Sequence, residues 1–216
     1  MASKERPTPA GLTARGAATK ARIVAAAASL IHKQGVAGTS LDDVMAATDT
    51  SKSQLYHYFA NKDALIHEVV QSQLEHVISA QQPDLAEISS WDGLQRWCDH
   101  LLSMARATQG VGGCPLGSLV GELAEQSDSA RQVLAHSFAE WQSYLSRGFA
   151  AMRDKGELAA DADPDELALT VLTALQGGLL MAQTMRTARP VELALNMALG
   201  HIAVYQRSPK QAGRRH

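Results

Sequence analysis

Apolar residues recur every three or four positions through most of this 216-residue chain, which is the period of an amphipathic α-helix. No convincing run of alternating β-branched residues indicates a strand. Breaks rich in Gly, Pro and Asp separate the helical stretches, so the pattern predicts an all-α fold. Helices are expected over about 18–34, from Asn61 to near Pro83, and over about 85–108, 116–126, 128–155, 164–187 and 190–206.

Helix boundaries are best defined in the first third of the chain. Gly35 is expected to end the first helix. Thr39 or Ser40 can cap a short second helix, and Thr50 or Ser51 can cap a short third one. Two short helices joined by a three-residue turn and preceded by a longer helix are typical of a helix-turn-helix module.

The short third helix has one apolar and one polar side. Leu55 and Phe59 are expected to pack it onto the preceding helices. The side chains on its outward face are long or hydrogen-bonding, of the kind that reaches phosphates and base edges in a major groove. These outward residues are Lys52, Ser53, Gln54, Tyr56 and His57.

The segment Thr39–Leu65 resembles the DNA-binding domain of the TetR family of transcriptional regulators. The most specific part is the string Leu-Tyr-x-Tyr-Phe-x-x-Lys-x-x-Leu over Leu55–Leu65, and the close match extends over about 17–80. Many relatives carry Ala-Gly-Val in the turn, where this chain has Thr48–Thr50. Because Asp tolerates the left-handed backbone conformation, Asp49 is expected to preserve the turn.

The resemblance implies a set of residues that contact DNA. Lys62, at the start of the fourth helix, would hold a phosphate with the help of the helix N-terminus, although it could also be an ordinary surface lysine. Thr39 and Ser40 would anchor the second helix on the opposite strand, and Tyr56 could instead be a core aromatic residue. The full set is Thr39, Ser40, Thr50, Ser51, Lys52, Ser53, Gln54, Tyr56, His57 and Lys62.

The last two predicted helices carry apolar stripes suited to an interface between two copies of the chain. In the family that the chain resembles, these helices form a four-helix bundle across a dimer. The alternative is that they only complete the core of one copy. The predicted interface residues are Leu172, Leu175, Gly178, Leu179, Leu195, Leu199, Ile202 and Tyr205.

The middle helices hold most of the aromatic residues, and the resemblance implies a small-molecule pocket among them. An apolar cavity with a few polar groups is what such a site needs, but aromatic residues at helical spacing are more often plain core. Few charged residues are candidates for burial here, which favours an apolar or aromatic ligand. The candidate pocket residues are Trp97, His100, Leu101, Met104, Phe138, Trp141, Tyr144 and Gln176.

The net charge of −2 conceals an uneven distribution along the chain. The formal charge is +4 over residues 1–62, −10 over 63–206 and +4 over 207–216. An acidic body cannot bind a polyanion over its whole surface, whereas a basic N-terminal segment can face one. A solvated charge fluctuation would give the same numbers, so charge alone does not identify a DNA-binding protein.

Four regions and one function follow from the pattern and the resemblance together. They are a flexible arm over 1–16, the helix-turn-helix domain over 17–62, a helical regulatory and dimerisation domain over 63–207, and a basic flexible tail over 208–216. The expected function is a ligand-responsive DNA-binding transcriptional regulator. It would be a homodimeric repressor, released from a palindromic double-stranded operator by a small, largely apolar molecule.

Two other functions are compatible with an all-α chain of this kind. One is a helical small-molecule-binding protein without specific DNA binding, and the other is a nucleoid-type protein that binds DNA without sequence preference. The acidic body argues against the second. The first predicts DNA binding that is absent or insensitive to salt.

Enzymatic and metal-dependent functions find little support in the sequence. His67 and Glu68 lack the second histidine of a zinc-protease helix. The segment Gly110–Gly117 has Pro115 where a dinucleotide-binding loop needs its third glycine. No nucleophile elbow or phosphate-binding loop is present. We therefore expect a protein that is not an enzyme and that uses no metal or other cofactor.

The two cysteines and the chain's apolar stretches bear on its location. Cys98 and Cys114 cannot form a disulfide framework. Cys114 precedes a Pro-initiated helix, so it is either a redox-sensitive thiol or a small buried residue. The longest apolar stretch, Leu167–Ala182, is shorter than a membrane span and includes Gln176. A cytoplasmic protein with no membrane partner is expected.

Overall fold

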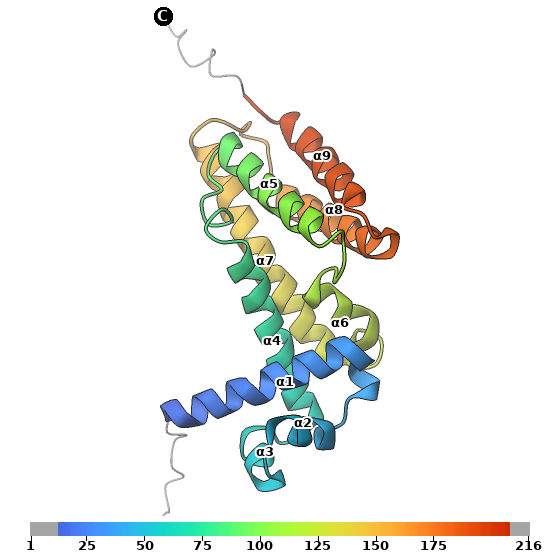
Figure 1. Ribbon diagram of the computed structural model, residues 1–216. Helices are drawn as coiled ribbons and strands as arrows, with labels where there is room; N and C mark the ends of the chain where they lie inside the picture. Colours follow the sequence, from blue (N-terminus) through green and yellow to red (C-terminus); the bar gives the residue numbers. More distant parts are fainter. Residues whose placement is uncertain (1–12, 208–216) are drawn as a thin grey trace, which may run out of the picture. The chain divides into compact units, whose positions relative to one another are not determined.

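The computed structural model describes residues 13–207 and confirms the all-α prediction for that part of the chain. An isolated antiparallel bridge joins Leu158 and Gln206, and no strand is present among the described residues. The helices of these residues are α1 (Ala14–Gly38), α2 (Leu41–Thr48), α3 (Lys52–Tyr58), α4 (Lys62–Ala80), α5 (Trp91–Ala107), α6 (Pro115–Leu123), α7 (Asp128–Asp154), α8 (Pro164–Met185) and α9 (Arg189–Ala203) (Figure 1).

The chain divides into two compact units, one that ends at Ser72 and one that begins at Gln73. The division falls well within α4, whereas the sequence placed it after Lys62, the first residue of that helix. The first helix begins at Ala14, so the last residues of the predicted arm are helical. Thr13 caps it by accepting a hydrogen bond from the Gly16 backbone N–H. The rest of the predicted arm and the predicted tail lie outside the described residues.

The first unit packs α1, α2 and α3 around a small apolar core. Ile23, Ala27 and Val44 are buried, as are Leu55 and Phe59. Gly35 interrupts α1 with a φ of 78°, a left-handed conformation that glycine adopts without steric cost. The predicted break at Gly35 is therefore confirmed, although helical backbone resumes for a few residues beyond it.

Side-chain caps define the ends of the short helices. Ser40 and Asp43 form a reciprocal capping box at the start of α2, and Ser51 and Gln54 form another at the start of α3. Asn61 accepts a hydrogen bond from the Ala64 N–H at 2.8 Å and so caps α4. Of the alternatives left open by the sequence, the structure selects Ser40 and Ser51 as the N-caps.

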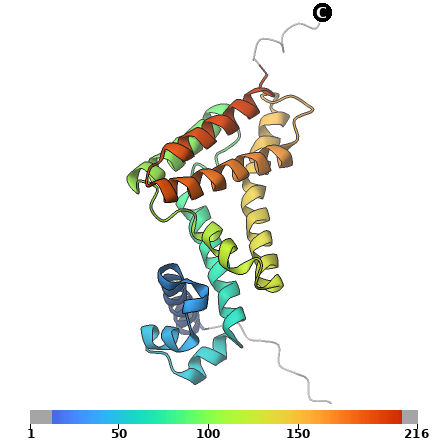
Figure 2. The same cartoon turned by 90° about the vertical axis from the view of Figure 1, so that its right-hand side faces the viewer.

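The second unit is built on α5, α7, α8 and α9. Helix α8 packs against α7 and α9, and Figure 2 shows α8 and α9 running side by side. Trp97, Trp141 and Phe149 are fully buried in its core. Turns occupy residues 81–87, where the sequence predicted the start of a helix, and Ser90 caps α5 instead.

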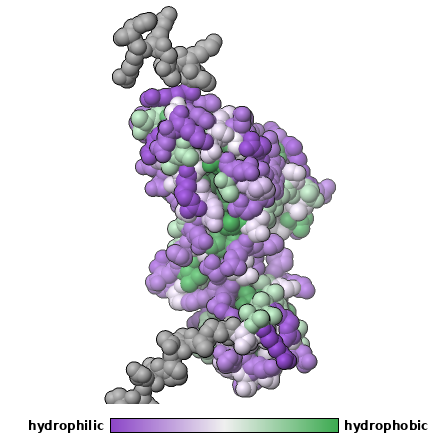
Figure 3. All heavy atoms as spheres, turned by 90° about the vertical axis from the view of Figure 1, so that its left-hand side faces the viewer, coloured by the Kyte–Doolittle hydropathy of each residue, from purple (hydrophilic) through white to green (hydrophobic). Residues whose placement is uncertain are grey.

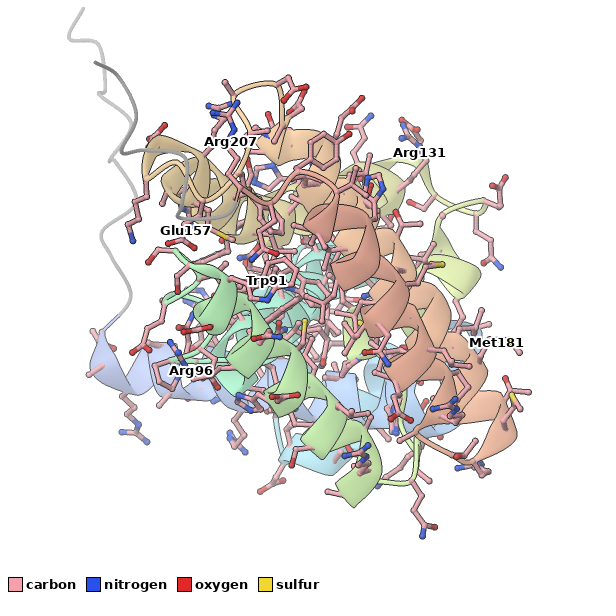
Figure 4. All side chains as sticks on the ribbon, turned by 90° about the horizontal axis from the view of Figure 1, so that it is seen from above. Trp91, Arg96, Arg131, Glu157, Met181 and Arg207 are labelled. Atoms are coloured by element: carbon pink, nitrogen blue, oxygen red, sulfur yellow. The ribbon has the colours of Figure 1, made fainter. Side chains whose placement is uncertain are left out.

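Hydrogen bonds from the start of α5 and from the end of the described chain meet at Glu157. Its carboxylate accepts from the Trp91 backbone N–H at 3.0 Å, and its carbonyl accepts from the Arg207 N–H at 2.9 Å. Figure 4 shows these three residues close together, between the start of α5 and the segment that follows α9. The start of α5 and the end of the described chain are thus joined to the loop that follows α7.

The surface of the second unit is polar in some regions and apolar in others. The side of the molecule drawn in Figure 3 is mainly hydrophilic, with hydrophobic residues in smaller areas. Helix α8 is more apolar than this surface. By length and composition alone, this 22-residue helix could cross a membrane. Within the unit, 44% of that segment is buried.

Candidate functional site

The outward side of α3 presents the polar surface that the sequence predicted. Lys52, Ser53, Gln54 and His57 are exposed, and Tyr56 is 45% exposed although it is a large aromatic residue. On the opposite side, Leu55 is completely buried. The structure therefore brings the predicted outward residues of α3 together on one accessible helix face.

The turn between α2 and α3 is fixed by backbone geometry and by one long side chain. Asp49 ends α2 in the left-handed conformation, with φ 49° and ψ 44°, which confirms that Asp can take the place of glycine in this turn. The Arg22 guanidinium of α1 donates a hydrogen bond to the Thr48 carbonyl. Helix α1 thereby holds the end of α2 and so the start of the turn.

Two residues of the predicted DNA-contacting set lie in the interior. Thr39 and Thr50 are buried, so their side chains do not belong to the accessible surface. The Thr39 hydroxyl donates to the Gly35 carbonyl at 2.8 Å, beside the break in α1. The Thr50 hydroxyl donates to the Thr48 carbonyl at 3.4 Å. Each hydroxyl satisfies a backbone carbonyl of its own unit, and direct contact of these two residues with DNA stays a prediction.

Lys62 is half-buried and is directed toward the protein's own backbone. Its ammonium group donates to the Val36 carbonyl at 2.7 Å, which connects the start of α4 to the end of α1. An ammonium group has three donors, so this bond leaves capacity for other acceptors. In this structure the contact that it makes is intramolecular.

Ser40, Ser51 and Gln54 are exposed but also form the caps described above. The Gln54 side-chain carbonyl accepts from the Ser51 N–H at 3.1 Å, so the amide end of Gln54 remains available as a donor. Hydrogen bonds from the Ser40 hydroxyl and then from its backbone N–H lower the pKa of Asp43. These caps hold α2 and α3 in place independently of any ligand.

Helices α8 and α9 share a large exposed apolar face in the second unit. A shallow groove runs between them, and the end of Met181 points away from the neighbouring helices in Figure 4. Leu180 is 64% exposed and Met197 is 66% exposed. The exposed large apolar residues of this face are Leu169, Leu180, Met181, Met185, Leu193 and Met197. We call this set the α8–α9 face.

The predicted interface residues occupy the other side of the same helices. Leu172, Leu175, Gly178, Leu195 and Ile202 are buried within one copy of the chain, so they contribute little to the accessible surface of these helices, and their place in a dimer interface stays a prediction. A Cβ added at Gly178 would lie 2.9 Å from the Ala194 Cβ, so Gly178 serves the close packing of α8 on α9. The remaining predicted residues, Leu179, Leu199 and Tyr205, are half-buried.

A cavity of about 190 Å³ opens in the second unit between α4, α5, α6, α7 and α8. Buried lining residues include Leu101, Trp141 and Leu175, whereas His76 and Val111 lie at its exposed rim. The remaining lining residues are Val77, Ala80, Gln81, Met104, Ala105, Thr108, Gly110, Gly113, Cys114, Pro115 and Leu179.

The structure places three of the predicted pocket residues, Leu101, Met104 and Trp141, in the lining of this cavity. The other five are outside the lining, and the structure shows what each of them contacts instead. Trp97 is buried behind it and donates its indole N–H to Gln81 at 3.0 Å. His100 bonds to Asp84 at 2.7 Å.

Two of the remaining three make ring contacts with other side chains. Phe138 stacks on Trp141, and the Tyr144 ring lies under the Arg147 guanidinium. Gln176 lies beside Gly117 and forms a side-chain hydrogen bond with Cys114, which does line the cavity. Most of the missed lining residues come from α4 and from the loop before α6, where helical spacing carried no signal of a cavity, and the others lie on α5, α6 and α8.

Both cysteines are buried and free, and burial raises the pKa of each thiol. The pKa of Cys98 rises to about 12. Cys114 is the N-cap of α6 and accepts from the Gly117 N–H at 3.3 Å, which only partly offsets the effect of burial on its pKa. A reactive thiolate needs a lowered pKa and exposure. The geometry therefore favours the small buried residue over the redox-sensitive thiol. No group of three metal-ligating side chains occurs among the residues described.

Comparison with known proteins places both units in one family. The family model described as bacterial regulatory proteins, tetR family, matches residues 23–69. The model described as tetracyclin repressor-like, C-terminal domain, matches residues 91–198. The two models together include α3 and the α8–α9 face.

Individual relatives agree with the family models. A transcriptional regulator of the helix-turn-helix type from the lacX 3′ region of Lactococcus lactis is 30% identical over 179 residues, which are 81% of this chain and 88% of that protein. The transcriptional repressor DhaR of Mycobacterium sp. (strain GP1) is 26% identical, over 76% of this chain and 82% of that protein. A TetR-family regulator of Cytophaga hutchinsonii has the same fold, with a TM-score of 0.78 at 21% identity over 92% of this chain and 100% of that one.

Proposed function

The chain belongs to the TetR family of transcriptional regulators and is a DNA-binding regulator rather than an enzyme; from this premise we propose that it is a homodimeric repressor that a small, largely apolar molecule releases from its operator. The observation that carries the proposal is the exposed polar face of α3, fixed at its start by a capping box. The other parts rest on the α8–α9 face and on the cavity.

We assign DNA recognition to the exposed residues of the first unit. Gln54 can offer its amide N–H group to a base edge, and Lys52 can pair with a phosphate. Tyr56 and His57 would contact the backbone of the duplex, as would the exposed hydroxyls of Ser40, Ser51 and Ser53. Thr39, Thr50 and Lys62 would support this surface from behind.

We assign dimerisation to the α8–α9 face. Its exposed methionine and leucine side chains are grouped on two neighbouring helices and are not scattered singly over the surface. Grouped exposed apolar residues of this kind mark interaction sites. Covering the face with a second copy would bring two helix-turn-helix modules to the two half-sites of a palindrome, as two-fold symmetric regulators require. The face could also meet a membrane, but the acidic residues at the start of α8, including Asp163 and Glu166, favour self-association.

We assign effector binding to the cavity of the second unit, in the cytoplasm, where the regulated DNA is accessible. A ligand that binds one arrangement of the dimer more tightly than the other shifts the population toward it. A release-competent arrangement would no longer match half-sites ~34–36 Å apart. The coupling free energy for such a switch is typically ~1–3 kcal/mol.

The experiment that tests this function is fluorescence anisotropy of the purified protein. DNA from upstream of the protein's own gene is compared with scrambled DNA of the same composition at physiological salt. We expect a preference of ~10³-fold or more for the upstream DNA. If the protein binds both DNAs equally and weakly, the measurement is repeated with fragments that the protein selects from a random DNA library. Equal and weak binding there as well would instead support the helical small-molecule-binding protein without specific DNA recognition.

A further inference from the structure

The charged residues of α8 and of the turn after it lie at the two ends of the helix. Glu166 belongs to the acidic first turn, three residues before Leu169 of the α8–α9 face and therefore on the same side of the helix. Arg186 directly follows Met185, the last residue of α8, and no residue between Glu166 and Arg186 is charged. The face therefore has an acidic end and a basic end, with an uncharged surface between them.

The charges of Glu166 and Arg186 are not neutralised within one copy. Both residues are exposed, and neither side chain has an ion pair or a hydrogen bond among the described residues. Neighbouring charges are engaged, because Asp165 accepts from a serine of α7 and Arg189 pairs with Glu192 at 2.8 Å. At a rise of about 1.5 Å per residue, Glu166 and Arg186 lie about 30 Å apart along α8, too far to pair with each other.

Two copies could cover each other's α8–α9 face in either of two directions under two-fold symmetry. If the α8 helices ran in the same direction, the two acidic ends would meet, as would the two basic ends. If they ran in opposite directions, Glu166 of each copy would lie opposite Arg186 of the other, and the pair would form twice per dimer. Like charges that face each other across an interface are unfavourable, so the charges favour the opposite direction.

The middle of α8 has the shape that this second arrangement needs. Gly177 lies about midway between Glu166 and Arg186, and it is exposed in the groove between α8 and α9. A Cβ added at Gly177 would meet no atom within 4 Å, whereas one added at Gly178 would lie 2.9 Å from the Ala194 Cβ. Packing within one copy therefore accounts for Gly178 but not for Gly177, where two α8 helices could cross closely.

We propose that two copies of this chain pair with their α8 helices in opposite directions, and that Glu166 and Arg186 are the specificity-determining residues of this pairing. The inference rests on the proposed function, because it requires that a second copy covers the α8–α9 face. The apolar residues of the face supply most of the affinity, and the two Glu166–Arg186 pairs set the direction and the choice of partner. A chain of the same fold with an acidic residue in place of Arg186 is thus a poor partner.

Charge reversal tests the pairing by sedimentation equilibrium on the full chain at low ionic strength, where ion pairs are screened least. Glu166→Arg and Arg186→Glu each place like charges opposite each other at both pairs. We expect either change to raise the dissociation constant of the dimer ~10-fold or more. An equimolar mixture of the two variants restores both pairs, so mixed dimers should form with a constant within about threefold of wild type. Glu125→Arg, the same charge change at an exposed position between α6 and α7, should leave dimerisation unchanged.

A chain that carries both changes separates this pairing from an effect on α8 alone. An acidic start and a basic end also favour the helix dipole, and that contribution needs no second copy. In the double variant both pairs between copies are restored, so dimerisation should recover. The dipole is opposed at both ends, so thermal unfolding followed by circular dichroism should show a lower Tm. Single variants that dimerise like wild type would assign these charges to the dipole and overturn the proposal.

Disulfide formation reports the direction of pairing independently of charge. Under mild oxidation, Gly177→Cys should cross-link to its counterpart, and Glu166→Cys should cross-link only when it is mixed with Arg186→Cys. The native cysteines are buried and do not compete. A dimeric protein in which Glu166→Cys cross-links to itself would overturn the inference and leave the proposed dimer in place. A wild type that stays monomeric while it binds its operator would overturn the proposed dimer, and the inference with it.

Discussion

The two units of this chain carry their functional features in different physical forms. In the unit that ends at Ser72, the features are polar side chains on short helices whose starts are fixed by Ser40 and Ser51. In the unit that begins at Gln73, they are a cavity and an apolar face, so a ligand or a second copy would complete them. The first kind of site is specified by residue identity, whereas the second depends on how helices pack.

This contrast means that substitutions should act differently in the two units. In the first unit, a conservative change removes one contact and leaves the others in place. In the second, a charge on the α8–α9 face disrupts an entire surface at once.

The largest effect is expected from Met197→Glu on the α8–α9 face. A second copy would bury this charge without a partner, and an unpaired buried charge is strongly destabilising. We expect analytical ultracentrifugation to show one copy per particle and operator affinity to fall ~10²-fold or more. Val120→Glu, a matched change at another exposed apolar position, should leave both unchanged. A dimeric Met197→Glu variant with normal affinity would argue that this face is not the interface.

A smaller and more selective effect is expected from Gln54→Ala. Loss of a side chain that reads a base edge costs ~1–3 kcal/mol of discrimination at one base pair. The capping bond to Ser51 is lost as well, but this affects all DNA sequences alike. Anisotropy on an operator series with single substitutions should therefore show relaxed preference at one position, with Ser53→Ala as the control. Equal loss on operator and random DNA would remove Gln54 from the base-reading set.

Lys62→Met and Lys52→Met separate a supporting lysine from a DNA-binding one. Because Lys62 donates to the Val36 carbonyl, its loss should lower the free energy of unfolding by about 1 kcal/mol in urea titrations. The salt dependence of DNA binding should stay unchanged. Lys52→Met should leave unfolding unchanged and reduce the salt slope by roughly one unit. If the slope instead falls in the Lys62 variant, that lysine contacts phosphate after all.

The smallest effect is a pH dependence at the start of α2. The folded protein lowers the pKa of Asp43, so its carboxylate stabilises the fold above the unfolded-state pKa of ~3.9, and this contribution is lost as the pH falls through the folded pKa. Asp43→Asn should be slightly less stable than wild type at pH 7, and the difference should disappear at acid pH. A difference that stays constant from pH 7 down to well below the folded pKa would show that the charge plays no part in the cap.

The sequence predicted the first unit in detail, because its signals are local. Gly35, Ser40, Ser51 and Asn61 act within one helical turn of their own positions, so cap and break chemistry located the helices correctly. The string Leu55–Leu65 also identified the family. What local signals did not show was the burial of Thr39 and Thr50, which depends on packing among all three helices.

The second unit was predicted less well, because its cavity and its exposed face depend on packing between helices and not on local signals. Apolar periodicity indicated that α8 and α9 each have a buried side, but it could not tell whether that side meets the same chain or a second copy. Leu172 and Leu195 proved to be intramolecular core, and the exposed apolar face lies on other residues. The cavity is a space between five helices and a glycine-rich loop, and only Leu101, Met104 and Trp141 among its predicted residues line it.

We propose that this chain reads DNA sequence as a two-fold dimer. Selection of bound fragments from a random double-stranded DNA library tests this proposal, because the selection itself reveals the operator sequence. We expect enrichment of a palindromic motif whose half-sites are centred about one helical turn, ~10 base pairs, or a multiple of it apart. Recovery of a single unrepeated motif, or of no motif from a library that the folded protein binds, would contradict it.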